Sequence, residues 1–149
     1  MTTSIARVFA CCCIVAAPAF AQTQAGKMAD AVVYASSANA KFMAMDAKSP
    51  IKSAALFGDA NKDAPHGEFV TFPPNFDAGG WHVHTNTVNL VVIKGAYIYR
   101  DENGEKRVAA GQFIRIPGGH RHWSGSDAKE GALFYMHSQA KMDQTASPK

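Results

Sequence analysis

Cysteine is scarce in this chain, and its distribution limits the kinds of stabilisation available. The three cysteines are adjacent, at Cys11, Cys12 and Cys13, and lie within an apolar run near the N-terminus. That run is too short to cross a hydrocarbon layer of about 30 Å, which requires about 20 apolar residues, and no later run is long enough either. The sequence therefore predicts no membrane span, and no disulfide or thiolate metal ligand beyond the N-terminal run.

The chain also lacks any cluster of basic residues. Its 15 Lys and Arg are nearly balanced by 12 Asp and Glu, giving a formal net charge of +3. These residues are scattered, and no stretch of them would follow a phosphate backbone. Nucleic acid is therefore not an expected partner.

The first residues have the pattern of a secretory signal peptide. Arg7 precedes the apolar run 8–17, and Ala19-Phe20-Ala21 provides a small-x-small cleavage site. We expect residues 1–21 to be a signal peptide that is cleaved after Ala21, which would place the protein in the periplasm or outside the cell. A lipoprotein signal ending at Cys11 is the alternative, but the apolar segment before Cys11 is very short.

The rest of the chain is long enough for one domain with a sizeable core. Residues 22–50 are expected to form an N-terminal arm or a short helix, because helical and strand-like spacings both occur there. Residues 51–139 are expected to form the domain itself. Residues 140–149 are expected to be a polar C-terminal tail, loosely attached.

The domain is predicted to be all-β. Short runs rich in β-branched and aromatic residues are separated by Gly, Pro, Asn and Asp, with Asn103-Gly104 as a strong hairpin signal. This spacing is typical of a sandwich or barrel. The predicted strands are 68–72, 81–84, 88–94, 96–100, 106–109, 112–116 and 131–138.

Two histidines on one predicted strand could chelate a metal ion. His82 and His84 are separated by one residue, so both side chains project from the same face of a strand. Such a pair alone is more often solvent-facing than a ligand pair. A third imidazole, His122, follows a Pro-Gly-Gly turn after another predicted strand, and a barrel could bring it to the pair.

These residues resemble the two sequence motifs of the cupin superfamily. The second motif fits well, because Gly111, Pro117, Gly119 and His122 occupy its positions in order. Ser126 stands where that motif ends in asparagine. The resemblance covers roughly residues 51–139.

The first cupin motif fits only in part. His82, His84 and Gly95 match it, but the glutamate that normally follows the histidines is missing. Its place falls on Val88 or Asn89, depending on the spacing used. The resemblance therefore implies a metal site with three histidine ligands and no carboxylate.

The resemblance implies an all-β fold, a cupin-type antiparallel jelly-roll β-barrel. It also implies a divalent transition metal, Fe, Zn, Ni or Mn, at His82, His84 and His122, and a homodimer as an expected assembly. Three-histidine cupins that oxidise thiols or diketones are precedents. Residue types by themselves do not select among these ions.

The other histidines leave alternatives open. His120 could replace His122 as ligand, and either His120 or His137 could act as a catalytic general base if it points into the cavity. The default for His137 is a core or rim histidine, and His66, in a Pro-His-Gly segment, is expected at the surface.

The sequence is compatible with two functions. One is an exported metalloenzyme acting on a small, anionic molecule as an oxygenase, isomerase or lyase. The other is a non-catalytic module that binds a small ligand or senses a metal, which the missing carboxylate and the unassigned general base favour. A β-domain without metal is the weakest option, because it leaves the histidine spacing unexplained.

Overall fold

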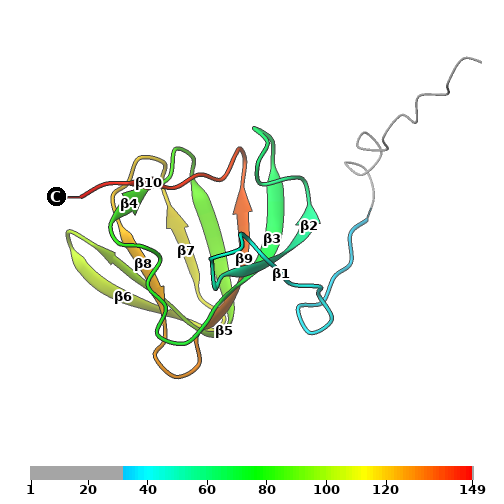
Figure 1. Ribbon diagram of the computed structural model, residues 1–149, viewed down its shortest axis with the longest axis horizontal. Helices are drawn as coiled ribbons and strands as arrows, with labels where there is room; N and C mark the ends of the chain where they lie inside the picture. The colour runs from blue at the N-terminus through cyan, green and yellow to red at the C-terminus, as the bar shows by residue number, and fades with distance from the viewer. Residues whose placement is uncertain (1–31, 149) are drawn as a thin grey trace, which may run out of the picture.

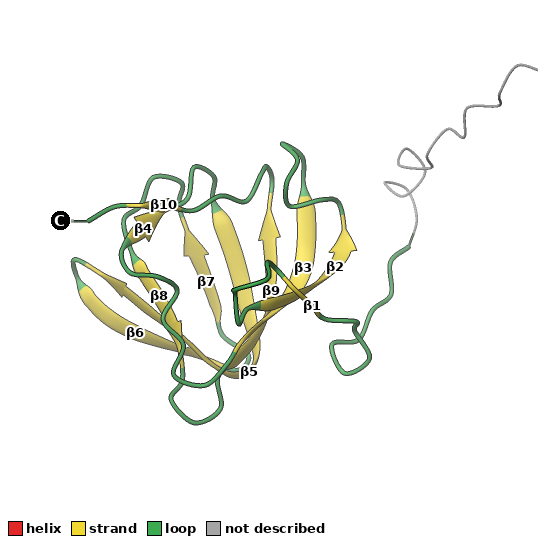
Figure 2. Ribbon diagram, in the orientation of Figure 1, coloured by secondary structure: helices red, strands yellow, loops and turns green. Residues whose placement is uncertain are grey.

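The computed structural model describes residues 32–148 and is built entirely from strands and loops (Figure 1, Figure 2). The predicted signal peptide and the first part of the arm lie outside the described residues. No helix occurs in the described part, so none there is long and apolar enough to cross a membrane. The strands are β1 Met43–Ala44, β2 Lys52–Phe57, β3 His66–Phe72, β4 His82–Val83, β5 Val88–Asp101, β6 Gly104–Ala109, β7 Phe113–Ile116, β8 Trp123–Ser126, β9 Ala132–Ser138 and β10 Thr145–Ala146.

All strand pairs are antiparallel, and β5 belongs to both halves of the barrel. Its first half lies between β9 and β7, and this sheet continues from β9 through β3 and β2 to β1. Its second half lies between β6 and β8. One strand therefore joins two walls, which curl around a shared interior (Figure 1). The predicted all-β antiparallel architecture is confirmed.

Gly95 is the point at which β5 passes from one wall to the other. Its φ of 69° is in the left-handed region, and a Cβ built there would lie 2.2 Å from the carbonyl oxygen of Gly131. Only glycine avoids both the strained backbone and the collision. The two runs predicted on either side of Gly95 are thus one bent strand.

Alternating side chains of these strands fill the barrel with an apolar core. On β9, Phe134 and Met136 point inward and are almost fully buried. The Phe134 ring packs edge-on against Phe72, with centroids 5.1 Å apart, and against Tyr97 at 5.5 Å. This packing holds the strand carrying Tyr97 against the opposite wall.

Two strands of substantial length escaped prediction from the sequence. β2 and β8 contain few β-branched residues, so their composition does not indicate a strand. Their neighbours supply the pairing, as in the register of Ala54 with Phe69 and of Gly125 with Ile98. Residues 22–50 were expected to form an arm or a short helix. In the described part of this segment no helix occurs, and β1 pairs with β2 as part of an extended arm.

The expectation of a loose C-terminal tail was wrong. Residues 141–147, here called the C-terminal strap, run across the end of the barrel beside β4 (Figure 1). Thr145 pairs with Val83 and Ala146 with His82, while Met142 packs against the core. Polar composition did not reveal the strap because its binding depends on backbone pairing and polar contacts with residues far away in the sequence.

Candidate metal centre

Backbone pairing brings the three histidines of the two motifs together. His82 lies in β4, His84 directly follows the last residue of β4, and His122 directly precedes β8. The His82 and His122 amides each donate to the other's carbonyl, at 2.8 and 3.0 Å. His84 shares the inward face of His82, as expected of residues two apart on a strand. The convergence expected from the sequence is therefore present.

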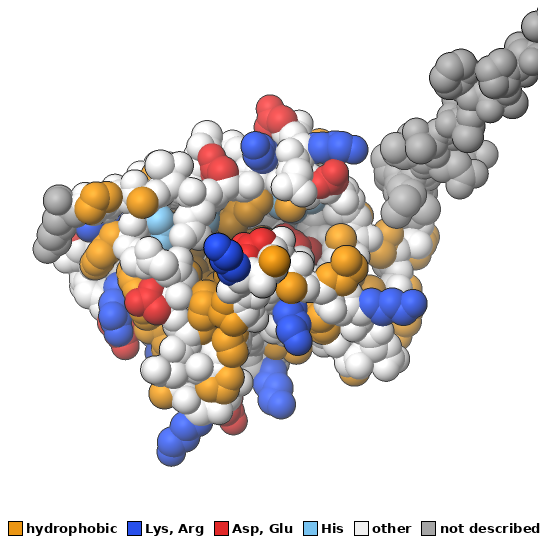
Figure 3. Space-filling model, in the orientation of Figure 1, with side chains coloured by type: hydrophobic (Ala, Val, Ile, Leu, Met, Phe, Trp, Pro, Cys, Tyr) orange, Lys and Arg blue, Asp and Glu red, His pale blue; other side chains and the backbone are white. Residues whose placement is uncertain are grey.

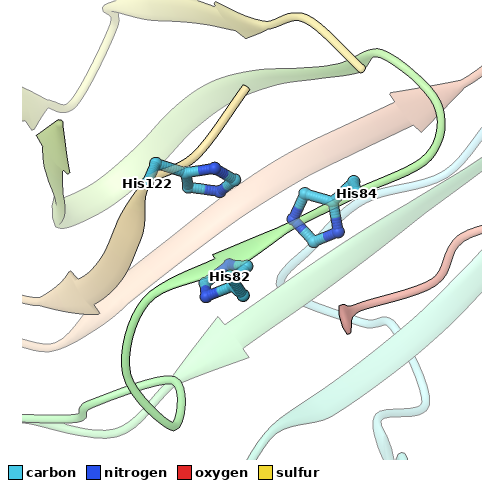
Figure 4. A group of neighbouring side chains, drawn as sticks. All are labelled: His82, His84 and His122. Atoms are coloured by element: carbon cyan, nitrogen blue, oxygen red, sulfur yellow. The ribbon is translucent and has the colours of Figure 1, made fainter. Parts of the chain in front are cut away.

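The three rings surround one small space (Figure 4). Their centroids are 4.4 Å apart for His82 and His122, and 5.1 Å apart for each pair that includes His84. One nitrogen from each ring lies within 4.8 Å of the others, and all three side chains are buried. Metal–nitrogen bonds of about 2 Å place ligand atoms about 3 to 4 Å apart, so only small side-chain adjustments are needed.

Backbone carbonyls fix which nitrogen of each ring is available. Nδ1 of His82 donates to the Gly80 carbonyl at 2.8 Å, and Nδ1 of His122 donates to that of His120 at 2.9 Å. Nδ1 of His84 donates to the carbonyl of Asp143 in the strap. A carbonyl can only accept, so Nδ1 carries the proton and Nε2 carries the lone pair in each neutral ring.

Nε2 of His122 supports a metal site most directly. This atom is buried and has no hydrogen-bond partner among the described residues. An unpaired buried polar atom destabilises a protein by about 1 to 3 kcal/mol, so such atoms are rare unless a ligand satisfies them. A lone pair shared with the two neighbouring imidazoles suits a late transition metal.

Burial keeps the three imidazoles in the form that binds metal. Removal from water lowers the pKa of His82 and of His84 from 6.5. For His122, burial is again the largest cause, and the neighbouring histidines add to it, lowering its pKa to about 4. All three rings are therefore neutral at pH 7, ready to coordinate without first losing a proton.

These pKa shifts predict how the metal-free protein responds to acid. In the unfolded chain, His122 protonates near 6.5, but in the folded protein it resists protonation until about pH 4. Acid therefore favours the unfolded state, and the free energy of unfolding should fall by up to about 3 kcal/mol as the pH drops from 6.5 towards 4. Urea denaturation of chelator-treated protein at several pH values measures this loss.

The matched variant His122→Asn should reduce that pH dependence to the share contributed by His82 and His84. Carboxylates such as Asp77 and Asp143 have pKa values below 3.8, so their effect appears only in more acidic solution. A wild-type stability that is constant between pH 6.5 and 4.5 would contradict the assigned burial of the three rings.

Among the described residues, no carboxylate takes the place of the missing glutamate. Val88, one of the two positions for it, points into the barrel beside His84 and is 2 % exposed. Asn89 lies on the opposite face of β5, paired with His137. Within residues 32–148, the group of side chains with ligand spacing contains three histidines and no acid.

A cavity of about 70 Å³ adjoins His84 inside the barrel. Its walls are apolar, except for the His84 ring and Tyr97, and include Val88, Ile116 and Met136. Pockets for drug-sized ligands are about 300 to 1,000 Å³, so this space accepts only a very small molecule or part of a larger one.

The two candidate general bases do not join the three rings. His137 lies on the outer face of β9, on the side away from Met136, with its ring 6.2 Å from Phe57. His120 turns away to Asp101, whose Oδ2 lies 3.3 Å from Nε2. Neither occupies the cavity beside His84. His120 contributes its backbone carbonyl, which orients His122.

Two tyrosines of β5 lie next to the three histidines. Tyr99 stacks on the His122 ring, with centroids 5.6 Å apart, and donates its hydroxyl to Asp101 at 3.1 Å. Burial and the Asp101 carboxylate raise the pKa of Tyr99. Tyr97 hydrogen-bonds Ser124 at 2.5 Å, and burial raises its pKa to about 12. Both therefore stay protonated.

The C-terminal strap is the part of the site that sequence reasoning missed. Asp143 supplies its carbonyl to His84, and its carboxylate accepts hydrogen bonds from the amide and hydroxyl of Thr85. Partners of this kind hold a ligand ring in place, and their loss typically weakens metal binding by about 10- to 100-fold. No ligand motif marked Asp143, because its contribution is a backbone atom.

Comparison with known families decides the family of this chain. A family model described as a domain of unknown function, DUF4437, matches residues 32–146. The chain belongs to the DUF4437 family. The match spans the barrel together with most of the strap, and includes all three histidines of the site. Among curated proteins, none matches the chain.

Solved structures show that this DUF4437 protein has the cupin fold. The polyketide cyclase RemF from Streptomyces resistomycificus superposes with a TM-score of 0.65 and 14% identity, covering 80% of this chain and 87% of RemF. An RmlC-like cupin from Shewanella frigidimarina gives 0.56 and 16%, covering 74% and 93%. A cupin-like protein from Thermotoga maritima gives 0.50 and 19%, covering 65% and 78%. At these identities, the likeness concerns the fold alone.

Proposed function

We propose that this DUF4437 cupin is an exported protein that binds a divalent transition metal through Nε2 of His82, His84 and His122. The observation that carries the proposal is the buried, unpartnered Nε2 of His122, placed beside two imidazoles with the same proton arrangement. The signal-peptide pattern at residues 1–21 supports export to the periplasm or beyond. The metal is Fe, Zn, Ni or Mn, of which Fe, Zn and Ni are the ions that imidazole suits best.

The ligand set determines what chemistry the centre would offer. Three neutral imidazoles cancel none of the charge of a divalent ion, whereas a glutamate would cancel one unit. The ion would act as a strong Lewis acid with a position open to substrate, as in catalytic sites with three protein ligands. A small anionic molecule is the occupant that this charge favours. The apolar walls around His84 would exclude bulk water from it.

Enzymatic activity is the first candidate function, as a metal-dependent oxygenase, isomerase or lyase. RemF is a polyketide cyclase, and its likeness supports a barrel that can house a reaction but specifies no substrate here. We also propose that the protein forms a homodimer through its sheets.

A non-catalytic binding module is the second candidate, and one observation favours it. His137 and His120, the expected general bases, lie outside the cavity beside His84. Without a base near the open position, the protein would bind its ligand and release it unchanged.

One experiment separates the two candidates. The metal-loaded protein is screened by thermal shift against small carboxylates, diketones and thiols, and each stabilising compound is incubated with it in air and under argon. Mass spectrometry of the recovered compound then shows turnover or its absence. An enzyme is expected to convert a stabilising compound, while a binding module returns it intact. If no compound stabilises the metal-loaded protein more than the metal-free one, an open position on the metal is ruled out for these classes.

A further inference from the structure

A second pocket, of about 500 Å³, opens between the N-terminal arm and the barrel wall. The space-filling view shows acidic, basic and apolar side chains around a hollow on the face that β1 crosses (Figure 3). One side of the pocket is formed by β2, the loop residues 58–61 and the first residues of β3, and the other by the arm and Met142 of the strap. It is separate from the three-histidine group, none of whose residues lines it.

Two buried polar side chains of β3 line this pocket. His66 is 1 % exposed and Glu68 is 5 % exposed, so the expectation that His66 lies at the surface was wrong. The two are separated by one residue on β3 and share a face. Nε2 of His66 and Oε1 of Glu68 are buried, and each lacks a hydrogen-bond partner among residues 32–148.

Both unpartnered atoms, Nε2 of His66 and Oε1 of Glu68, are hydrogen-bond acceptors and would be satisfied by a hydrogen-bond donor. Nδ1 of His66 lies 3.4 Å from the Ala64 carbonyl, to which it donates, so Nε2 of the neutral ring is an acceptor. A carboxylate oxygen also accepts. Lys41 lines the same pocket, but neither it nor any other Lys or Arg of the described chain forms an ion pair with Glu68. An unpaired buried carboxylate is costly to a fold. The missing partner therefore carries several N–H donors and a positive charge.

The walls around these two atoms define the rest of the ligand. Met43, Met45, Met142 and Phe57 give the pocket an adaptable apolar wall. The rest of the lining includes the polar side chains of Lys41, Ser53, Asp59 and Asn61. A bare hydrated ion would leave the apolar wall unused. In a ligand with an ammonium group on a short alkyl or aryl chain, the ammonium group would contact the polar end of the pocket. The chain would pack against the apolar wall.

We infer that this pocket binds a small organic primary ammonium ion, held by Glu68 and His66. The three N–H donors of the ammonium group would satisfy Oε1 and Nε2 with one to spare. Met45 and Met142 also line the cavity beside His84, so the two spaces are neighbours. The ammonium site does not depend on a metal, because neither His66 nor Glu68 belongs to the three-histidine group.

The test uses the full chain after chelator treatment and a series of primary ammonium chlorides from methylammonium to benzylammonium. Each is compared by calorimetry with the alcohol of the same carbon skeleton. At least one ammonium ion is expected to bind, and the alcohols are not. Glu68→Gln, which keeps the shape of the side chain, is expected to weaken that binding by about 10- to 100-fold. The same variant should unfold at a higher temperature without ligand, since it removes a partly buried negative charge that has no ion-pair partner among the described residues.

Matched variants separate this site from general charge effects and from the metal centre. Glu102→Gln removes an exposed carboxylate outside the pocket and should leave ammonium binding unchanged. Ala55→Phe narrows the pocket from β2 without altering Glu68 and should block binding. His122→Ala should leave ammonium binding intact, so failure of the metal proposal would be seen separately. Equal binding of alcohols and ammonium ions, or equal losses in Glu68→Gln and Glu102→Gln, would overturn the inference.

Discussion

Protein purified without a histidine tag is expected to contain about one equivalent of a divalent transition metal, and the triple variant His82→Ala, His84→Ala, His122→Ala is expected to contain almost none. The three imidazoles are the side chains with ligand spacing in the described chain, and nothing else there could replace all of them. Elemental mass spectrometry after dialysis measures the metal content. Circular dichroism checks that the variant keeps its strands.

Two other histidines provide matched controls for this result. His137→Ala and His120→Ala each remove an imidazole that lies outside the group, so both variants should retain the metal content of the wild type. If the triple variant kept the wild-type metal content, the proposed centre would be refuted. If His137→Ala or His120→Ala lost the metal as completely as the triple variant, the ligand assignment would be wrong.

Gly95→Ala is expected to destabilise the fold by about 2 to 5 kcal/mol. A residue other than glycine costs about 1 to 2 kcal/mol in the left-handed region, and forcing extra atoms into a packed site adds about 1 to 3 kcal/mol. The added Cβ would meet the Gly131 carbonyl oxygen at 2.2 Å, and backbone cannot easily move aside. Equilibrium denaturation in urea measures the loss of stability.

Gly111→Ala is the matched control for the steric part of this effect. Gly111 has a comparable φ of 80°, but a Cβ there would have no neighbour within 4 Å. The free energy of unfolding of this variant should therefore fall only by the cost of the left-handed backbone conformation, about 1 to 2 kcal/mol. Equal losses at the two glycines would show that the collision with Gly131, and hence the crossing of β5 between the two walls, contributes little.

The strands rich in β-branched and aromatic residues could be predicted from the sequence. Most of the predicted runs correspond to strands, and the Asn103-Gly104 turn joins β5 to β6 as expected. β2 and β8 could not be found in this way, because alanine, serine and glycine carry no strand preference of their own. They are strands because β3 and β5 offer free edges beside them.

The candidate centre was predictable because its residues follow motif spacing. Strand geometry alone places His82 and His84 on one face, and the turn before His122 occurs where the motif requires it. Metal binding itself remains a prediction. The burial of His66 could not be foreseen, since its Pro-His-Gly context is typical of an exposed turn, whereas the arm and β2 line a pocket over it. His137 was ambiguous for a related reason, because the face of a strand that points inward depends on register.

The sequence by itself determined the antiparallel β architecture and the placement of His82 and His84 on one face of a strand. These follow from local geometry, which the order of residues specifies directly. Tertiary structure alone decided that the C-terminal strap supplies a carbonyl to His84, that His120 and His137 lie outside the cavity, and that Glu68 is buried beside His66. Each depends on contacts between segments far apart in the chain, and such contacts leave no periodic signal in the sequence.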